Sequence, residues 1–214
     1  HPDADHLTGL IEVLKRYKVK WIIESGVECG KPDCLAWNEL KGKEDAAVIL
    51  AKLGDSIVLD ENTEIFILHP FENLSGKKFS KANNTSIVAK LIYGGTLSVP
   101  YGHAERGGYS VLLTGDIEKQ VEEKLVLAGL DINADYLKIP HHGSKTSTTD
   151  EFLDSVSPLL AFISLGLDNR YGHPHEVVRE RLEKRSIKYY RTDASGTILL
   201  SCRLNSPCQI ETQN

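Results

Sequence analysis

The sequence lacks the features that mark several large classes of protein. No apolar run approaches the ~20 residues that a helix needs to cross a membrane, and no segment reads as a signal peptide. There is also no internal repeat or low-complexity segment. With 41% hydrophobic and 26% charged residues over 214 positions, the composition is that of a globular protein with a substantial core, most simply one domain.

Basic residues are not in excess. The 25 Lys and Arg residues are outnumbered by 30 Asp and Glu residues, which gives a net charge of -5 and argues against a broad basic face for nucleic acid. If the carboxylates of Asp3, Asp5 and Asp116 held two divalent ions, the ions would offset most of this charge and make the local site positive. Nucleic-acid binding through a few local cations therefore stays open.

The four cysteines lack the C-x2-C spacing of zinc ribbons. Cys29 and Cys34 are spaced C-x4-C, and Cys202 and Cys208 are spaced C-x5-C. We expect unpaired or structural cysteines, with disulfides as the alternative if the domain faces an oxidising compartment.

Side chains that bind metals are concentrated in the first six residues, His1-Pro2-Asp3-Ala4-Asp5-His6. Their spacing fits a strand end that runs into a tight turn, where alternate side chains converge on one point. The alternative is a frayed polar terminus without function. Residues 7–17 have the periodicity of an amphipathic helix, so the positive end of its dipole points towards this run.

Strands and helices alternate along the rest of the chain, which predicts an α/β fold. The segments that read as strands are 19–23, 56–59, 64–68, 87–93, 111–114, 136–139, 159–164, 187–190 and 197–201. Helices are expected at 117–128, 149–156 and 176–186, and a loop after Cys29 is expected to lead into a helix through about Lys52. Residues 94–108 read as a long hairpin connection or an insertion, and the polar residues after Leu204 read as a tail that frays.

Three segments place polar residues directly after an apolar strand, where ligands of α/β proteins gather. They are Leu113-Thr114-Gly115-Asp116, Lys138-Ile139-Pro140-His141-His142-Gly143-Ser144 and Asn169-Arg170-Tyr171-Gly172-His173-Pro174-His175. Each has a simpler interpretation, as a turn aspartate, surface histidines or the start of a helix. However, six of the eight histidines lie in the opening run or in two of these segments, which favours a single site.

These segments, with Asn83-Asn84-Thr85-Ser86-Ile87-Val88 and Tyr190-Arg191-Thr192-Asp193, occur in the order found in one known family. The chain resembles the metallo-β-lactamase-like C-terminal domain of ComEC-type competence proteins, which carry DNA into bacteria. In two places it departs from the wider superfamily: Asp3 replaces the second histidine of H-x-H-x-D-H, and Asn83 to Ser86 stand where a further histidine is usual. The resemblance implies a metallo-β-lactamase-like αββα sandwich over residues 1–204, followed by a polar tail over 205–214. It also implies that strands normally found before the first motif are missing from this chain.

The resemblance implies two metal positions. His1 and Asp3 would serve one ion, Asp5 and His6 the other, and Asp116 would bridge them. His141, His142 or both would complete the set, with His173 as a further candidate. Because sites rich in carboxylates suit Mn²⁺ or Mg²⁺ and zinc favours His and Cys, we expect two divalent ions, Mn²⁺ rather than Zn²⁺.

The activity implied is hydrolysis of a phosphodiester by a deoxyribonuclease that degrades one DNA strand during natural transformation. Two ions about 3.5–4 Å apart activate water and stabilise the oxygens of an in-line displacement. Asp5 and Asp116 would act directly in catalysis, and His173 or His175 would protonate the leaving oxygen. The residues expected to hold phosphate groups are Asn84, Lys138, Ser144, Lys145, Thr146, Arg170 and His175.

Two other classes of function stay open. One is a two-metal hydrolase of another ester, of phosphocholine or acyl type, and the other is a non-catalytic module that binds DNA or a partner protein. The resemblance implies single- or double-stranded DNA and the membrane channel domain of the same full-length protein as partners. It further implies a monomeric domain, soluble in itself, that belongs to a bacterial cell-membrane protein and lies on the extracytoplasmic side.

Overall fold

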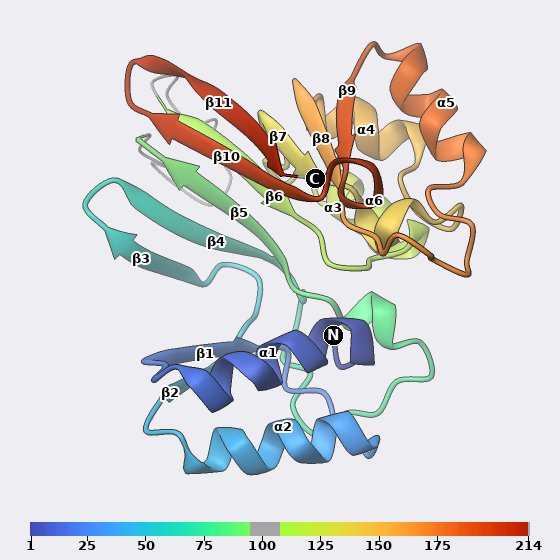
Figure 1. The fold of residues 1–214 in the computed structure, drawn as a ribbon. Helices are drawn as coiled ribbons and strands as arrows, with labels where there is room; N and C mark the ends of the chain where they lie inside the picture. The colour runs from blue at the N-terminus through green and yellow to red at the C-terminus, as the bar shows by residue number, and fades with distance from the viewer. Residues whose placement is uncertain (95–107, 214) are drawn as a thin grey trace.

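A computed structural model describes residues 1–94 and 108–213. Among these residues the largest sheet has seven strands, which lie side by side in their sequence order (Figure 1). They are β3 (Ser56–Asp60), β4 (Thr63–His69), β5 (Val88–Tyr93), β6 (Tyr109–Leu113), β7 (Tyr136–Lys138), β8 (Leu160–Ile163) and β9 (Lys188–Arg191). Strands β3 to β6 pair antiparallel and β6 to β9 pair parallel, so the α/β expectation is confirmed.

Helices cover the parallel half of this sheet, because parallel neighbours need a crossover connection. They are α3 (Lys119–Leu127), α4 (Asp150–Val156) and α5 (Glu176–Lys184), which gather beside β7, β8 and β9 (Figure 1). The main core lies between them and the sheet, where Leu112, Leu137, Phe152 and Leu182 are fully buried. The side chain of Thr149 caps α4 by accepting a hydrogen bond from Phe152 N. The strands β6 and β7 that this packing holds lead directly into Asp116 and the His141-His142 pair.

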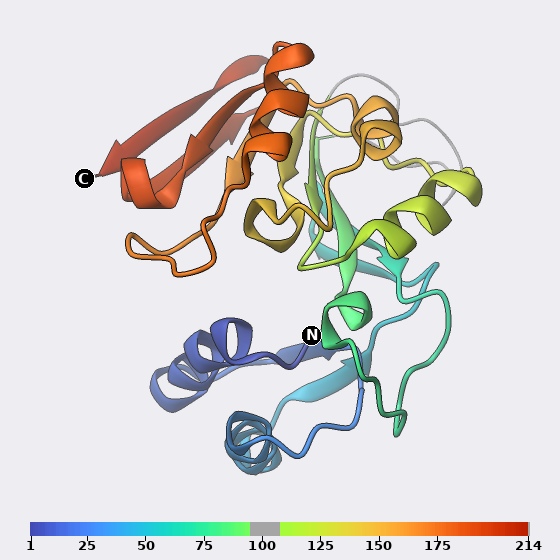
Figure 2. The ribbon, with the colours of Figure 1, turned by 90° about the vertical axis from the view of Figure 1, so that its right-hand side faces the viewer.

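A smaller layer lies below the large sheet and contains α1 (Ala4–Arg16), β1 (Trp21–Glu24), α2 (Pro32–Lys43) and β2 (Ala47–Leu50). Strands β1 and β2 pair parallel, and α1 and α2 lie side by side (Figures 1 and 2). The N-terminus lies between this layer and the large sheet, close to the short 3₁₀ helix η1 (Ala82–Thr85) (Figure 2). The opening run therefore occupies the junction between the two layers.

The expectation of a helix through about Lys52 is wrong. Helix α2 ends at Lys43, and Ala47 to Leu50 form β2, which pairs residue by residue with β1. This run is too short for its apolar period to distinguish a buried helix from a strand. The β-branched Val48 and Ile49 favour the strand once a partner strand lies alongside.

The expectation that the residues after Leu204 fray is also wrong. Ser206–Gln213 forms β11, which pairs antiparallel with β10 (Thr197–Arg203). A disulfide joins Cys202 to Cys208 across this hairpin, and the Tyr109 hydroxyl donates a hydrogen bond to the Ser206 carbonyl. The segment is polar because it forms a largely exposed two-stranded sheet, not because it lacks structure.

The short helix α6 (Thr192–Ser195) follows β9. The long connection expected over 94–108 joins β5 to β6, but its residues 95–107 lie outside those that the structure describes.

Candidate metal centre

Asp116 lies at the centre of the candidate site. It follows β6 through Thr114 and Gly115, and its side chain is almost completely buried. Gly115 has a φ of +53°, and a Cβ there would lie 2.7 Å from the Ser86 side chain. A glycine at 115 is therefore what allows the chain to turn here and bring the Asp116 carboxylate inward.

Three imidazoles surround one oxygen of this carboxylate. Oδ2 of Asp116 lies 3.1 Å from Nε2 of His6, 3.2 Å from Nε2 of His142 and 3.8 Å from Nε2 of His1. The other oxygen, Oδ1, lies 3.4 Å from the Lys138 ammonium, which also donates a hydrogen bond to the Gly115 carbonyl. Asp116 thus has a histidine side and a lysine side.

The opening run is held by a helix and not by the strand end that its spacing suggested. Asp3 is the N-cap of α1, and Ala4, Asp5 and His6 form the first helical turn. The extended residues before the helix bring His1 back against His6, with 4.1 Å between the two ring centroids. The run is nevertheless ordered and convergent, which is contrary to a frayed terminus.

The two adjacent histidines after β7 point to different places. Both His141 and His142 lie in the short helix η2 (Pro140–Gly143) and have positive φ angles of 49° and 56°, which are uncommon outside glycine. Nδ1 of His142 lies 2.5 Å from the Ser164 carbonyl, to which it donates, so Nε2 is free to face Asp116. Nε2 of His141 is instead 3.3 Å from the Asn83 amide and Nδ1 is 3.3 Å from the Thr146 hydroxyl. The structure therefore brings His142, and not His141, into the cluster.

The resulting donor set fits a divalent metal. Ligand atoms of Asp5, His6, Asp116 and His142 all lie within 4.8 Å of one another. His1 and Asp3 adjoin this group, with 3.6 Å between His1 Nε2 and Asp3 Oδ2. Within the described part of the chain, the Nε2 atoms of His1, His6 and His142 are buried and face the Asp116 carboxylate, yet none makes a hydrogen bond of good geometry. Because buried nitrogen atoms are rarely left unpaired, three of them around one carboxylate indicate a site for metal ions.

The electrostatics of the site keep Asp116 ionised. Burial opposes its ionisation, but contacts with His142 and His6 and the nearby Lys138 hold the pKa of Asp116 below its usual value. The same contact with Asp116 raises the pKa of His142, whereas burial lowers that of Lys138. Burial, together with the neighbouring His175 and His141, lowers the pKa of His173 to about 4. The His173 ring is therefore neutral at neutral pH and lacks the extra proton that an imidazolium would give up as a general acid.

Some residues expected to hold phosphate groups are engaged in the fold. The Asn84 side chain accepts a hydrogen bond from Glu118 N, 2.9 Å away at the N-cap of α3, and contacts Gln120. Lys138 is held at Asp116, as described above. The hydroxyl groups of Ser144 and Thr146 lie 3.1 Å apart, and Ser144 is buried.

The remaining expected residues lie along the loops beside the cluster. Lys145 and Arg170 are exposed, and the backbone N–H of Lys145 donates to Nδ1 of His175, the residue that directly precedes α5. The His173 ring stacks on that of His142, with 6.5 Å between centroids and 13° between planes. Their positions do not test whether they bind phosphate groups or protonate the leaving oxygen, so these roles stay predictions.

Four residues of the site were not assigned from the sequence: Asn83, Ser86, Ser164 and Tyr171. Asn83 and Ser86 lie in a segment that carried the resemblance, but only Asn84 was chosen from it. Ser164 acts through its backbone carbonyl, which leaves no signal in the sequence. Tyr171 is exposed, and the sequence alone does not show that it lines the same cavity as Asp5 and Asp116.

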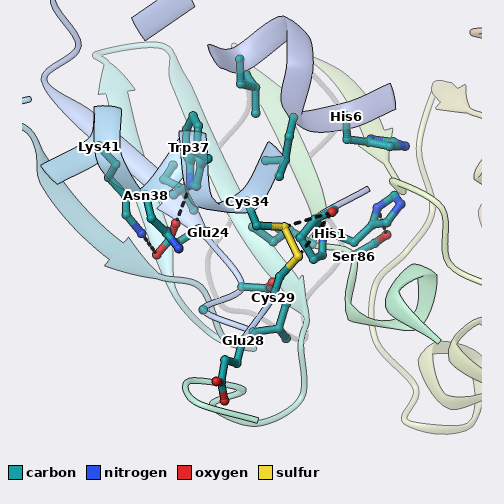
Figure 3. Close-up of a pocket in the computed structure, with 18 of the residues that line it drawn as sticks. His1, His6, Glu24, Glu28, Cys29, Cys34, Trp37, Asn38, Lys41 and Ser86 are labelled. Atoms are coloured by element: carbon teal, nitrogen blue, oxygen red, sulfur yellow. Dashed lines mark hydrogen bonds and ion pairs between the residues drawn. A yellow bond between two sulfur atoms is a disulfide. The ribbon is translucent and has the colours of Figure 1, made fainter. Parts of the chain in front are cut away.

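Cavities lie on both sides of the cluster. One, of about 670 Å³, reaches Asp5, Asp116 and His142 and extends out to Tyr171. The other, of about 620 Å³, reaches His1, His6 and Ser86 (Figure 3). Beyond them Figure 3 shows the Cys29–Cys34 disulfide and the group in which Trp37 and Lys41 bind the Glu24 carboxylate. Both cysteine pairs are thus disulfides, the alternative that the sequence left open.

Comparison with known proteins identifies the family. Residues 1–166 match the family model described as the metallo-beta-lactamase superfamily. This chain belongs to the metallo-β-lactamase superfamily. Its mixed sheet with flanking helices agrees with that fold, and the superfamily is typically one of metal-dependent hydrolases that bind divalent ions.

Relatives within the superfamily are competence and recombination proteins. The chain is 34% identical over 198 residues to ComE operon protein 3 of Bacillus subtilis. This match covers 92% of the chain and 23% of the relative. It is 43% identical over 93 residues to competence protein ComA of Neisseria gonorrhoeae and 41% identical over 92 residues to recombination protein 2 of Haemophilus influenzae. Each of these two matches covers 43% of this chain, and 14% and 11% of the relatives. The expected resemblance to the metallo-β-lactamase domain of ComEC-type competence proteins is confirmed.

The chain spans less than a quarter of the length of these relatives. In the part that the structure describes, no helix has the length and apolar character needed to cross a bilayer. A competence-related metallo-β-lactamase hydrolase domain is what the comparisons support.

Proposed function

We propose that this chain is a metal-dependent phosphodiester hydrolase that cuts DNA. The observation that carries the proposal is the group of three buried imidazole nitrogens that face the Asp116 carboxylate without a well-formed hydrogen bond. Asp116 and His142 also line a cavity of about 670 Å³. Phosphoryl transfer needs positive charge beside the reacting oxygens, and this donor set can bind the divalent ions that supply the charge.

The proposed ligands fall on two sides of Asp116. Asp5, His6 and His142 would hold one ion and His1 and Asp3 the other, with Asp116 shared. When bound, two divalent ions supply activation of water and stabilisation of charge on the phosphoryl oxygens. Three carboxylates in the set favour Mn²⁺ over Zn²⁺. Lys138 holds the second oxygen of Asp116 and so keeps the carboxylate turned towards the histidines.

A polymer fits the cavity better than a small enclosed ester. The Tyr171 side chain that lines the cavity is 79% exposed, so the cavity opens to solvent on that side. The exposed Lys145 and Arg170 are proposed to hold neighbouring phosphates of the strand. This openness weighs against a phosphocholine or acyl ester, for which a deep closed pocket would be expected.

The similarity to competence proteins supports DNA as the substrate and a membrane channel domain as the partner. The two disulfides support a position on the extracytoplasmic side, because disulfides persist in oxidising compartments. In this setting the chain would degrade one strand of incoming DNA.

A nuclease assay with parallel metal analysis tests the proposal. Labelled single- and double-stranded DNA would be incubated with the chain in Mn²⁺, Mg²⁺, Zn²⁺ or EDTA, beside the Asp116→Asn variant. Asp45→Asn, an exposed aspartate on the α2–β2 connection, is the matched control. We expect Mn²⁺-dependent cleavage by the wild type and the control and none by Asp116→Asn. Protein that binds metal yet cuts neither DNA would overturn the proposal, and protein without any bound metal would favour a non-catalytic module.

A further inference from the structure

A row of aromatic rings leads from the candidate metal centre to the surface. His142, in the cluster, stacks with His173 at 6.5 Å between centroids, and His173 stacks with Tyr171 at 5.7 Å and 25° between planes. Tyr171 lines the same cavity as Asp5 and Asp116, although its side chain is 79% exposed. One face of the Tyr171 ring thus rests on His173 while most of its surface is open to solvent.

The loop between β8 and α5 holds Tyr171 in this position. The Asn169 side chain binds both backbone groups of His173, with its amide 3.0 Å from the carbonyl and its oxygen 2.8 Å from the N–H. Between them, Gly172 has a φ of +71°, which allows the sharp turn that brings residues 171 and 173 into a stack. Tyr171 is therefore fixed by the loop, with one ring face already used and the other available.

We propose that Tyr171 stacks an unpaired nucleobase beside the phosphate held at the metal centre, and so selects single-stranded DNA. The inference rests on the proposed function and names the form of its substrate. A base inside a duplex is already stacked on both faces, whereas an unpaired base can place one face on a tyrosine. Stacking also suits a chain with a net charge of -5, which cannot rely on a wide basic surface.

Binding of oligonucleotides with and without bases tests the inference. Fluorescence anisotropy would compare fluorescein-labelled oligo-dT with an equal-length oligomer of abasic deoxyribose phosphates, in Ca²⁺ to limit cleavage. The variants are Tyr171→Phe, which keeps the ring, and Tyr171→Leu, which keeps bulk without an aromatic face. We expect Tyr171→Leu to weaken binding of oligo-dT roughly 5- to 150-fold, the range for loss of one base–aromatic stack. Tyr171→Phe should match the wild type, and all three proteins should bind the abasic oligomer equally and more weakly than the wild type binds oligo-dT.

The outcomes separate this inference from the proposed function. Three results would each overturn the stacking role. They are an equal loss of affinity for both oligomers in Tyr171→Leu, equal affinity of all three proteins for oligo-dT, and no binding of oligo-dT by the wild type. The expected binding pattern without any cleavage in Mn²⁺ would uphold stacking and refute the nuclease. Cleavage of DNA that Tyr171→Leu performs as well as the wild type, with unchanged binding, would uphold the nuclease and refute stacking.

Discussion

Oγ of Ser86 lies 3.0 Å from Nδ1 of His1, the ring nitrogen opposite the one that faces the Asp116 carboxylate. The same oxygen accepts a hydrogen bond from Asp116 N, at 2.9 Å. Ser86 is fully buried, and its carbonyl lies 2.6 Å from Nδ1 of His69. Ser86 therefore stands behind two proposed ligands without being one, and can hold the tautomer of His1 whose Nε2 is free for a metal.

Replacing Ser86 should weaken metal binding without removing a ligand. In Ser86→Ala the His1 ring loses its partner and the Asp116 N–H is left unpaired. Partners of this kind typically contribute roughly 10- to 100-fold to metal affinity, so Mn²⁺ affinity measured by calorimetry should fall by about that factor. Ser201→Ala, an exposed serine in β10, is the control and should bind Mn²⁺ like the wild type. Unchanged affinity in Ser86→Ala would contradict the positioning role.

The adjacent histidines offer a matched pair of variants. His142→Ala removes a proposed ligand 3.2 Å from Asp116, whereas His141→Ala removes a ring whose two nitrogens face Asn83 and Thr146. We expect His142→Ala to lose metal, as counted by mass spectrometry, and to lose activity by more than the roughly 100-fold of a supporting residue. His141→Ala should keep its metal. The reverse result, or equal loss in both, would contradict the assignment of His142.

Glu122, which is buried away from the metal centre, should make the stability of the fold depend on pH. Its carboxylate accepts hydrogen bonds from Thr148 N at 2.5 Å and from the N–H and hydroxyl of Thr149, both at 2.8 Å. Burial nevertheless raises the pKa of Glu122 above its usual value of 4.5. The folded state thus binds this proton more tightly than the unfolded state, so the contribution of Glu122 to stability falls as pH rises from about that usual value towards the raised one.

Urea unfolding in chelator measures this dependence. The free energy of unfolding of the wild type minus that of Glu122→Gln should decrease as pH rises above about 4.5. Glu123→Gln, an exposed neighbour in α3, should give a difference that hardly changes with pH. A difference for Glu122→Gln that grows with pH would show that the three hydrogen bonds outweigh burial and lower the pKa instead.

The C-terminal hairpin should depend on its disulfide. Cys202 and Cys208 close a short loop across β10 and β11, and closing a loop of this size contributes roughly 2–3 kcal/mol in the chain-entropy account. We therefore expect the Cys202→Ser, Cys208→Ser double variant to show faster amide hydrogen exchange in 206–213. Exchange in α3 should be the same as in the wild type. If exchange throughout β11 is also the same as in the wild type, strand pairing alone holds this strand.

Local sequence patterns located most of the site. An apolar strand followed by Gly115-Asp116 or by His141-His142 is a local signal, and both segments lie at strand ends that meet in one sheet. The choice between His141 and His142 could not be made from the sequence, because it depends on two positive φ angles and on the Ser164 carbonyl. The opening run was predicted to be a strand end because its metal-binding side chains alternate. The alternation does not reveal that a helix begins directly after Asp3.

The errors in the fold share a cause. Ala47 to Leu50 and Ser206 to Gln213 become strands only because β1 and β10 lie beside them. Neither segment is long or periodic enough to specify a strand alone, and pairing with a distant segment is what decides its structure. Sequence patterns were sufficient where one strand and its tip carried the signal, and insufficient where a partner strand was needed.

Anomalous diffraction at the manganese edge, from crystals of this chain soaked in Mn²⁺, tests the central claim most directly. The account predicts two peaks beside Oδ2 of Asp116, one contacted by His6 and His142 and the other by His1. No peak at Asp116, or manganese bound only at other carboxylates, would contradict a metal centre built from these residues.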